Sequence, residues 1–216
     1  MQKPKVRLTS DVVPKKYSIK LKPDLEAFVF EGEETIELSL KKPTSNIALH
    51  SKELEIESAK IGEVLAEKIS YDEKAETATF AFGQKIPAGD VKLHLVFRGI
   101  LNDKMHGFYR SSFMHEGKQK HIATTQFEST DARRAFPCFD EPAMKAVFEV
   151  SLTVPSDKEA ISNTMPTDII EHESGWKTIS FSPTPSMSTY LLAFIVGDFE
   201  HVEKKSKDGC LVRVFA

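Results

Sequence analysis

The chain is dominated by an alternation of apolar and polar residues with a period of two. It runs through residues 17–21, 35–40, 47–50, 54–56, 78–82, 91–97, 146–154, 177–181 and 210–216, and an apolar run at 189–196 belongs to the same series. Such alternation is typical of strands that bury one face and leave the other in water. The chain is therefore constrained to pack sheet against sheet.

Short turn-forming sequences separate these segments. Proline, glycine and aspartate are concentrated at residues 41–43, 86–90, 173–175 and 208–209, which predicts tight connections between strands. No stretch carries a helical pattern over the ~11 residues needed to indicate a helix. We expect an all-β fold, a β-sandwich or twisted multi-sheet domain of about ten or more mostly antiparallel strands. No linker or composition shift divides residues 1–216, which we interpret as a single domain.

Composition excludes several classes of protein. With 40% apolar and 28% charged residues and a net charge of −3, the chain is not disordered, collagen-like or a disulfide scaffold. The charge balance does not indicate a basic surface that would bind nucleic acid or an acidic membrane. Acidic residues also flank the basic runs at 15–16 and 204–205. No apolar run reaches the ~18 residues of a membrane span, and Met1 opens no signal-like sequence. We expect a cytoplasmic protein in which Cys138 and Cys210 are free thiols.

The alternation breaks between residues 123 and 145. Four carboxylates crowd two arginines here: Glu128, Asp131, Asp140 and Glu141 with Arg133 and Arg134. If residues 122–128 form a strand, Gln126 and Glu128 point to one face and Phe127 points into the core. The pattern alone allows either a salt-bridged connection between two sheets or a binding site.

The 17 residues from Gln126 to Pro142 closely resemble the signature of the amino-terminal domain of M1-family zinc aminopeptidases. The nearest likeness is to the puromycin-sensitive and tricorn-interacting-factor branch. Flanking stretches at 13–17, 107–111 and 187–194 agree with the family in the same order. The resemblance covers nearly the whole chain, and a 17-residue match is highly specific.

The resemblance implies that residues 1–216 form the saddle-shaped amino-terminal β-domain of a larger aminopeptidase. This domain would cover one side of a zinc site that the next domain holds. Glu128 would bind the free α-ammonium group of a peptide substrate, and Gln126 would line the pocket for its first side chain. A partly buried carboxylate facing an ammonium group makes a charge-assisted hydrogen bond, which lets an exopeptidase measure from the chain end. Arg133, Asp140 and Glu141 match the family too, and we interpret them as loop scaffolding.

The family's catalytic centre has no counterpart in this sequence. Members carry H-E-x-x-H, in which two imidazoles share one helical face and the glutamate polarises the metal-bound water. None of the seven histidines satisfies it; His115 and His121 are six residues apart in a segment that we expect to be a solvated hairpin. We expect no catalytic residue and no metal site in this chain, with zinc bound only in the full-length enzyme. His50 and His94 are predicted to lie on polar strand faces, and Cys138 to be a small buried residue.

The expected partners are the amino terminus of a peptide substrate and the enzyme's own catalytic domain, with no nucleic acid and no membrane. The alternative is a stand-alone, non-enzymatic β-sandwich that binds peptides or proteins. The aminopeptidase hypothesis predicts a longer reading frame containing H-E-x-x-H, whereas the binding module predicts a frame that stops near residue 216. A glycosidase is disfavoured because Asp140 and Glu141 are adjacent and diverge, while two catalytic carboxylates must face one cleft.

Overall fold

The computed structural model describes residues 7–173 and 175–216, and this part of the chain is nearly all β. The elements are β1 (Val12–Asp24), β2 (Val29–Leu40), β3 (Thr44–His50), β4 (Leu54–Ile61), β5 (Val64–Asp72), β6 (Thr77–Ile86), β7 (Gly89–Ile100), β8 (Gly107–His115), β9 (Lys118–Gln126), η1 (Ala132–Arg134), β10 (Val147–Pro155), β11 (Glu159–Ser162), β12 (Pro166–His172), β13 (Trp176–Phe181), η2 (Thr189–Leu191), β14 (Phe194–Gly197), β15 (His201–Lys205) and β16 (Leu211–Phe215). The labels η1 and η2 denote single turns of 3₁₀ helix.

The strands form three sheets. A ten-stranded sheet has the order β12-β13-β10-β1-β2-β7-β4-β5-β6-β3, a four-stranded sheet has the order β11-β14-β9-β8, and β15 pairs with β16. Within the described residues the parallel strand pair is β1 with β10, and the other strand pairs are antiparallel. The expected all-β, mostly antiparallel class is therefore confirmed.

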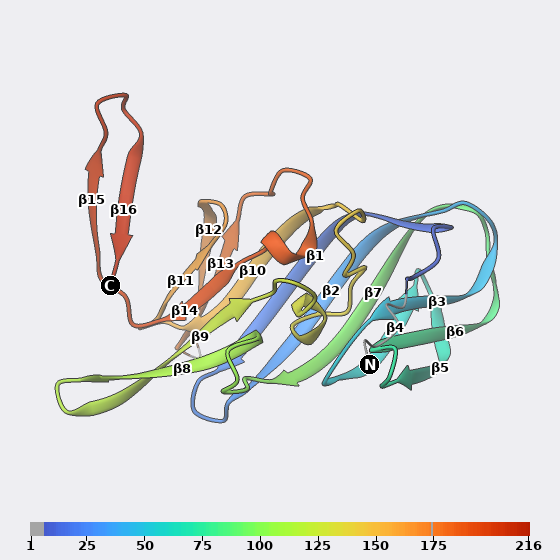
Figure 1. Cartoon of the computed structure of the whole chain (residues 1–216), viewed down its shortest axis with the longest axis horizontal. Helices are drawn as coiled ribbons and strands as arrows, with labels where there is room; N and C mark the ends of the chain where they lie inside the picture. The colour runs from blue at the N-terminus through green and yellow to red at the C-terminus, as the bar shows by residue number, and fades with distance from the viewer. Residues whose placement is uncertain (1–6, 174) are drawn as a thin grey trace.

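The four-stranded sheet lies across one face of the large sheet (Figure 1). A continuous series of seven aromatic rings joins the two layers, with neighbouring centroids 5.0–6.1 Å apart: Phe30, Phe108, Phe194, Phe127, Phe136, Tyr17 and Phe148. Edge-to-face and offset-stacked pairs at these distances add to the free energy gained from burying the rings. Six of the 15 phenylalanines of the sequence thus lie between the sheets.

Burial follows the predicted alternation in the central strands. In β10 and β13 every second residue is buried, as the period of two requires. The predicted turns join β2 to β3, β6 to β7 and β15 to β16; the one at 173–175 joins β12 to β13, and its Ser174 lies outside the described residues.

The structure departs from the sequence-based expectation at one predicted strand and at several strands that were not predicted. The apolar run 189–196 is not one strand, because it begins as η2 and only Phe194–Gly197 forms β14. Strands β5, β11, β12 and β15 lie outside the segments that we predicted as strands. Of these, β12 lies at the edge of the large sheet with all seven residues exposed. An edge strand that buries neither face has no reason to alternate.

Glu34 is a buried acid in the middle of β2. Its side chain lies on the core-facing side of the strand with Ile36 and Leu38, and the residue is 1% exposed. Neither carboxyl oxygen has a hydrogen-bond partner within the described residues. Burial raises the pKa of Glu34 well above its usual value, because removal from water disfavours the charged form.

No helix in the described part of the chain is long and apolar enough to cross a membrane.

We predict that Phe127→Ala lowers the free energy of unfolding by about 3–5 kcal/mol, the usual range for truncating a buried phenylalanine. Phe127 is 2% exposed and lies in the middle of the aromatic series. Urea denaturation of the chain measures the change. Phe113→Ala in the exposed part of β8 is the matched control and should change stability little. Equal effects of the two substitutions would contradict the role of Phe127 as an interlayer contact.

Glu34 should make stability fall as pH rises. Its folded-state pKa is raised above the unfolded value near 4.5, so folding takes up a proton at pH values between the two. The full stability is present below the unfolded pKa and is lost as pH climbs toward the folded pKa. Glu34→Gln should remove this slope in denaturation curves taken from pH 5 upward. Glu31→Gln, on the exposed face of the same strand, should retain it, and identical slopes for wild type and Glu34→Gln would contradict the assignment.

Candidate substrate-binding site

Strand β9 carries the chain into the region that interrupts the alternation. It pairs with β8 along its whole length, from Lys118 opposite His115 to Gln126 opposite Gly107. Gly107 has a φ of +70°, and a Cβ there would lie 2.6 Å from Cβ of Arg134. A larger residue would therefore push away the loop that follows β9. The strand ends at Gln126, two residues before the end that we predicted.

Gln126, Phe127 and Glu128 alternate in exposure as predicted, although Phe127 and Glu128 lie beyond the strand. Gln126 and Glu128 are exposed and Phe127 is buried. Gln126 Nε2 donates a hydrogen bond to the Glu128 carbonyl at 3.3 Å, and the backbone of Asp131 donates to the Phe127 carbonyl at 2.9 Å. The Glu128–Ser129 peptide bond is cis. The two predicted site residues therefore lie side by side on the surface, with their connecting residue fixed in the core.

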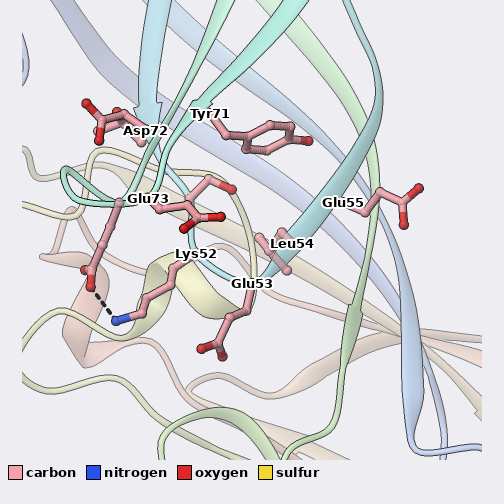
Figure 2. Close-up of a pocket in the computed structure, with 10 residues that line it drawn as sticks. Lys52, Glu53, Leu54, Glu55, Tyr71, Asp72 and Glu73 are labelled. Atoms are coloured by element: carbon pink, nitrogen blue, oxygen red, sulfur yellow. Dashed lines mark hydrogen bonds and ion pairs between the residues drawn. The ribbon is translucent and has the colours of Figure 1, made fainter.

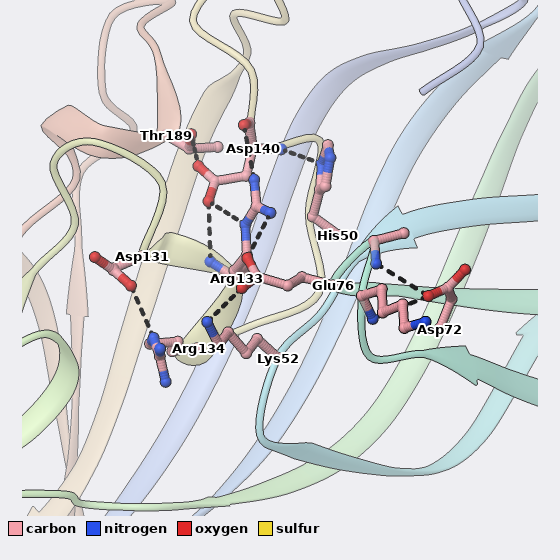
Figure 3. A network of polar contacts seen from close by, with 11 residues as sticks. His50, Lys52, Asp72, Glu76, Asp131, Arg133, Arg134, Asp140 and Thr189 are labelled. Carbon is pink, nitrogen blue, oxygen red and sulfur yellow. Dashed lines mark hydrogen bonds and ion pairs between the residues drawn. The ribbon is translucent and has the colours of Figure 1, made fainter. Parts of the chain in front are cut away.

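A buried ion pair fixes the other end of the loop. Asp140, whose side chain is 1% exposed, accepts hydrogen bonds from Arg133 Nε at 3.0 Å and from the Thr189 hydroxyl at 2.8 Å. Arg133 also donates from Nη1 to Glu76 at 3.1 Å, and Glu76 in turn pairs with Lys52 (Figure 3). These contacts tie the loop to the β3–β4 and β5–β6 connections and to η2. They confirm the interpretation of Arg133 and Asp140 as scaffolding.

Arg134 is neutralised separately. Its Nε donates to Asp131 at 2.7 Å, and its Nη1 pairs with Glu53. Although partial burial works against the charge, these two carboxylates hold the pKa of the Arg134 guanidinium above its usual value. The same contact lowers the pKa of Glu53, again against the effect of burial. Both loop arginines are thus occupied by acids other than Glu128.

Glu128 differs from the other acids of the loop in its contacts. Within the described residues its carboxylate has neither a hydrogen-bond partner nor an ion-pair partner. Glu141, by contrast, accepts from the backbone of Leu8 at 2.7 Å. Among the four carboxylates that the sequence analysis singled out, Glu128 alone is exposed and without a partner in the part of the chain that the structure describes. An acid in this state can accept hydrogen bonds from a cationic ligand.

The prediction for His50 is wrong. The residue is 1% exposed and is not on a polar face, because β3 ends there against residues 138–140. His50 and Cys138 exchange backbone hydrogen bonds at 2.8 and 3.0 Å, and His50 Nδ1 accepts from the backbone of Asp140 at 3.2 Å. His94 is partly exposed, with Nδ1 3.2 Å from the Thr35 hydroxyl, as expected for a polar strand face.

Cys138 is buried, as predicted, and both cysteines are free thiols. Burial raises the pKa of the Cys138 thiol well above its usual value, and the nearby Asp140 charge adds to the effect. A thiol held in its neutral form is a poor nucleophile. Cys138 is therefore a packing residue beneath the loop.

A pocket that sequence reasoning missed lies beside the network. Its volume is about 530 Å³, and its walls are the β3–β4 connection and the adjoining ends of β5 and β6, residues 51–55, 71–73 and 76–77. Lys52 and Glu76 line this pocket and also belong to the ion-pair network. Figure 2 shows Lys52 in the wall of the pocket. The labelled side chains Glu53 and Glu55 point in different directions rather than toward one centre. No local signal could have found this pocket, because its walls are about 20 residues apart in sequence.

The described residues do not form a site that fits a zinc ion. Within residues 7–173 and 175–216 no group of three or more His, Cys, Asp or Glu side chains is placed to hold a metal. His115 and His121 lie on β8 and β9 of the predicted hairpin, where His121 pairs with Ser112 and His115 with Lys118.

Comparison with known proteins identifies the family of this chain. A family model described as the peptidase M1 N-terminal domain matches residues 13–191. The chain belongs to this family. It is 42% identical to aminopeptidase M1 of Arabidopsis thaliana over 97% of this chain, and 25% of that protein is covered. It is 42% identical to aminopeptidase 2 of Candida albicans over 90% of this chain and 21% of that protein.

Aminopeptidase N of Rattus norvegicus is 35% identical over 97% of this chain and 24% of its own length. The chain thus spans about a quarter or less of these relatives. The resemblance drawn from residues 126–142 is confirmed at the level of the M1 family. Assignment to the puromycin-sensitive branch stays a prediction.

We predict that Asp140→Asn lowers the free energy of unfolding by about 1.5–3 kcal/mol, because buried Arg133 loses one of its two acid partners and keeps Glu76. Urea denaturation measures the change. Glu55→Gln is the matched control, since it makes the same chemical change in the exposed pair with Arg98, where little or no change is expected. If Asp140→Asn is as mild as Glu55→Gln, the buried pair does not hold the loop.

Proposed function

We propose that this chain is the amino-terminal, substrate-anchoring domain of a zinc metallo-aminopeptidase. The full-length protein would hydrolyse the first peptide bond of peptides that have a free amino end. The observation that carries the proposal is the free, exposed Glu128 carboxylate beside Gln126, in a chain of the M1 family. The relatives named above are all aminopeptidases, which supports the reaction class.

Glu128 would recognise the α-ammonium group of the substrate. An ammonium group donates charge-assisted hydrogen bonds to a carboxylate, and a blocked or internal residue offers no such charge. Because Arg133 and Arg134 are paired with other acids, the substrate would not compete with an internal cation for Glu128. The position of the ammonium group would then define which peptide bond comes first.

Gln126 would orient the first residue of the substrate. Its amide supplies both donors and an acceptor without a net charge, so it can bind substrate without competing for the ammonium group. The existing bond from Gln126 Nε2 to the Glu128 carbonyl supports a joint role, since it holds the two residues in register.

Zinc would be held by residues outside this chain, where it would supply the Lewis acid and the activated water of hydrolysis. The contribution of this chain would be binding and orientation alone. We also propose a cytoplasmic location, which the free cysteines favour. One relative, from Saccharomyces cerevisiae, is named as mitochondrial, so recovery of the protein in a mitochondrial fraction would overturn that location.

In the full-length protein we predict that Glu128→Gln lowers kcat/KM for aminoacyl substrates by about 100-fold, or about 2.7 kcal/mol of transition-state binding. The reason is the loss of a charge-assisted bond that a neutral amide cannot replace. Zinc content should stay unchanged. Glu116→Gln, which alters an exposed acid in the β8–β9 turn, is the control. An unchanged kcat/KM for Glu128→Gln would refute the ammonium role.

A second prediction concerns the chain by itself. The 216-residue chain should bind no stoichiometric zinc and should cleave no aminoacyl substrate, because none of its described residues forms a metal site. Metal analysis after dialysis and a fluorogenic aminoacyl assay measure both. Zinc near one equivalent, with activity that a chelator removes, would contradict the proposal that zinc is held outside this chain. It would favour an enzyme whose active site lies within these 216 residues.

A further inference from the structure

The pocket beside the ion-pair network combines acidic and apolar walls (Figure 2). It lies where β4 begins, β5 ends and β6 begins. Its volume of about 530 Å³ is within the usual range for small-molecule sites, roughly 300–1,000 Å³. Leu54 and Tyr71 supply apolar surface, and half of the ten lining residues are acids: Glu53, Glu55, Asp72, Glu73 and Glu76. This composition suits a cation that also carries apolar groups.

Two of these five acids have no cation beside them. The other three are paired within the protein: Glu53 with Arg134, Glu55 with Arg98, and Glu76 with Lys52 and Arg133. Asp72 and Glu73 are exposed, and neither has an ion-pair partner among the residues that the structure describes. Asp72 uses only Oδ1, which accepts hydrogen bonds from the backbone of Lys74 and Ala75 at 3.0 Å. Its other oxygen and the Glu73 carboxylate are therefore open to a ligand.

The lining also contains a buried hydroxyl group without a partner. Ser51 is 5% exposed, and its Oγ makes no hydrogen bond within the described residues. The residue is fixed in the wall, because its backbone N–H donates to the Glu76 carbonyl at 2.9 Å. Buried polar groups are almost always hydrogen-bonded, so an orphan hydroxyl in a pocket wall indicates a bound molecule that completes it. This observation is independent of the acids.

The carboxylates are not arranged around a single metal ion. The labelled side chains Glu53 and Glu55 point apart in Figure 2. Within residues 7–173 and 175–216 no group of three or more His, Cys, Asp or Glu side chains is placed to hold a metal. Acids from two separate segments, with Leu54 and Tyr71 in the same lining, instead suit a ligand whose positive charges are spread along an apolar chain.

We propose that this pocket binds a linear polyamine, a chain of methylene groups that carries several ammonium groups. Asp72 and Glu73 accept charge-assisted hydrogen bonds from one ammonium group. The methylene groups lie against Leu54 and the ring of Tyr71, which removes apolar surface from water. A second ammonium group donates to Ser51 Oγ. Lys52 does not repel the ligand strongly, because it is paired with Glu76.

Isothermal titration of spermidine into the 216-residue chain tests the site. Since Glu128 could also accept an ammonium group, the titrated chain carries Glu128→Gln. We expect saturable one-to-one binding. n-Butylamine, which has one ammonium group, should bind about tenfold more weakly because it loses a charge-assisted contact. Absence of saturable spermidine binding, or displacement of spermidine by Mg²⁺ as effective as by another diamine at equal ionic strength, overturns the proposal.

A substitution at the open acids locates the ligand. Glu73→Gln should raise the dissociation constant for spermidine about tenfold, through the same loss of a charged partner. Glu63→Gln is the matched control, since Glu63 is exposed in the β4–β5 turn at the far end of those strands from the pocket. It should leave the constant unchanged. Equal effects of the two substitutions would show attraction to the net charge alone and overturn the site.

The hydroxyl is tested by Ser51→Ala. Spermidine should bind about fivefold more weakly, as expected for one lost hydrogen bond. The free energy of unfolding should not fall, because the substitution removes a group that has no partner in the described part of the free chain. Urea denaturation measures the stability. An unchanged affinity would refute the contact between Ser51 and the ligand.

Discussion

The buried ion pair between Arg133 and Asp140 is the constraint on which the site depends. The pair occupies a position where an unpaired charge would be costly, and its remaining hydrogen-bonding capacity is met by Thr189, Glu76 and backbone groups. Those partners come from η2 and from the β5–β6 connection, so the loop after β9 is fixed from both sides.

A second constraint comes from the aromatic series between the sheets. Phe127 is part of that series and is also the residue between Gln126 and Glu128. The two surface groups are therefore positioned by the packing of the core as well as by the hydrogen bond between them. A carboxylate held in this way can stay unpaired and solvated and still have a defined place.

The sequence was sufficient for the fold class and for the exposure pattern of Gln126, Phe127 and Glu128. Alternation identified the central strands, and the break in alternation identified the loop with Gln126, Phe127 and Glu128. It failed where burial does not alternate, as in the exposed edge strand β12, and at His50, where the end of β3 is covered by residues 138–140. It also missed the pocket beside the network, whose walls come together only through strand pairing.

The sequence by itself determined which residues face the core, because a period of two is a local property of the chain and each strand carries it independently. It also carried the family signature in one continuous stretch. Only the tertiary structure decided which of the crowded carboxylates stays free. Arg133 and Arg134 pair with acids that are up to 81 residues away in sequence, namely Glu76 and Glu53. Ion pairing depends on distance in space, and strand topology sets that distance.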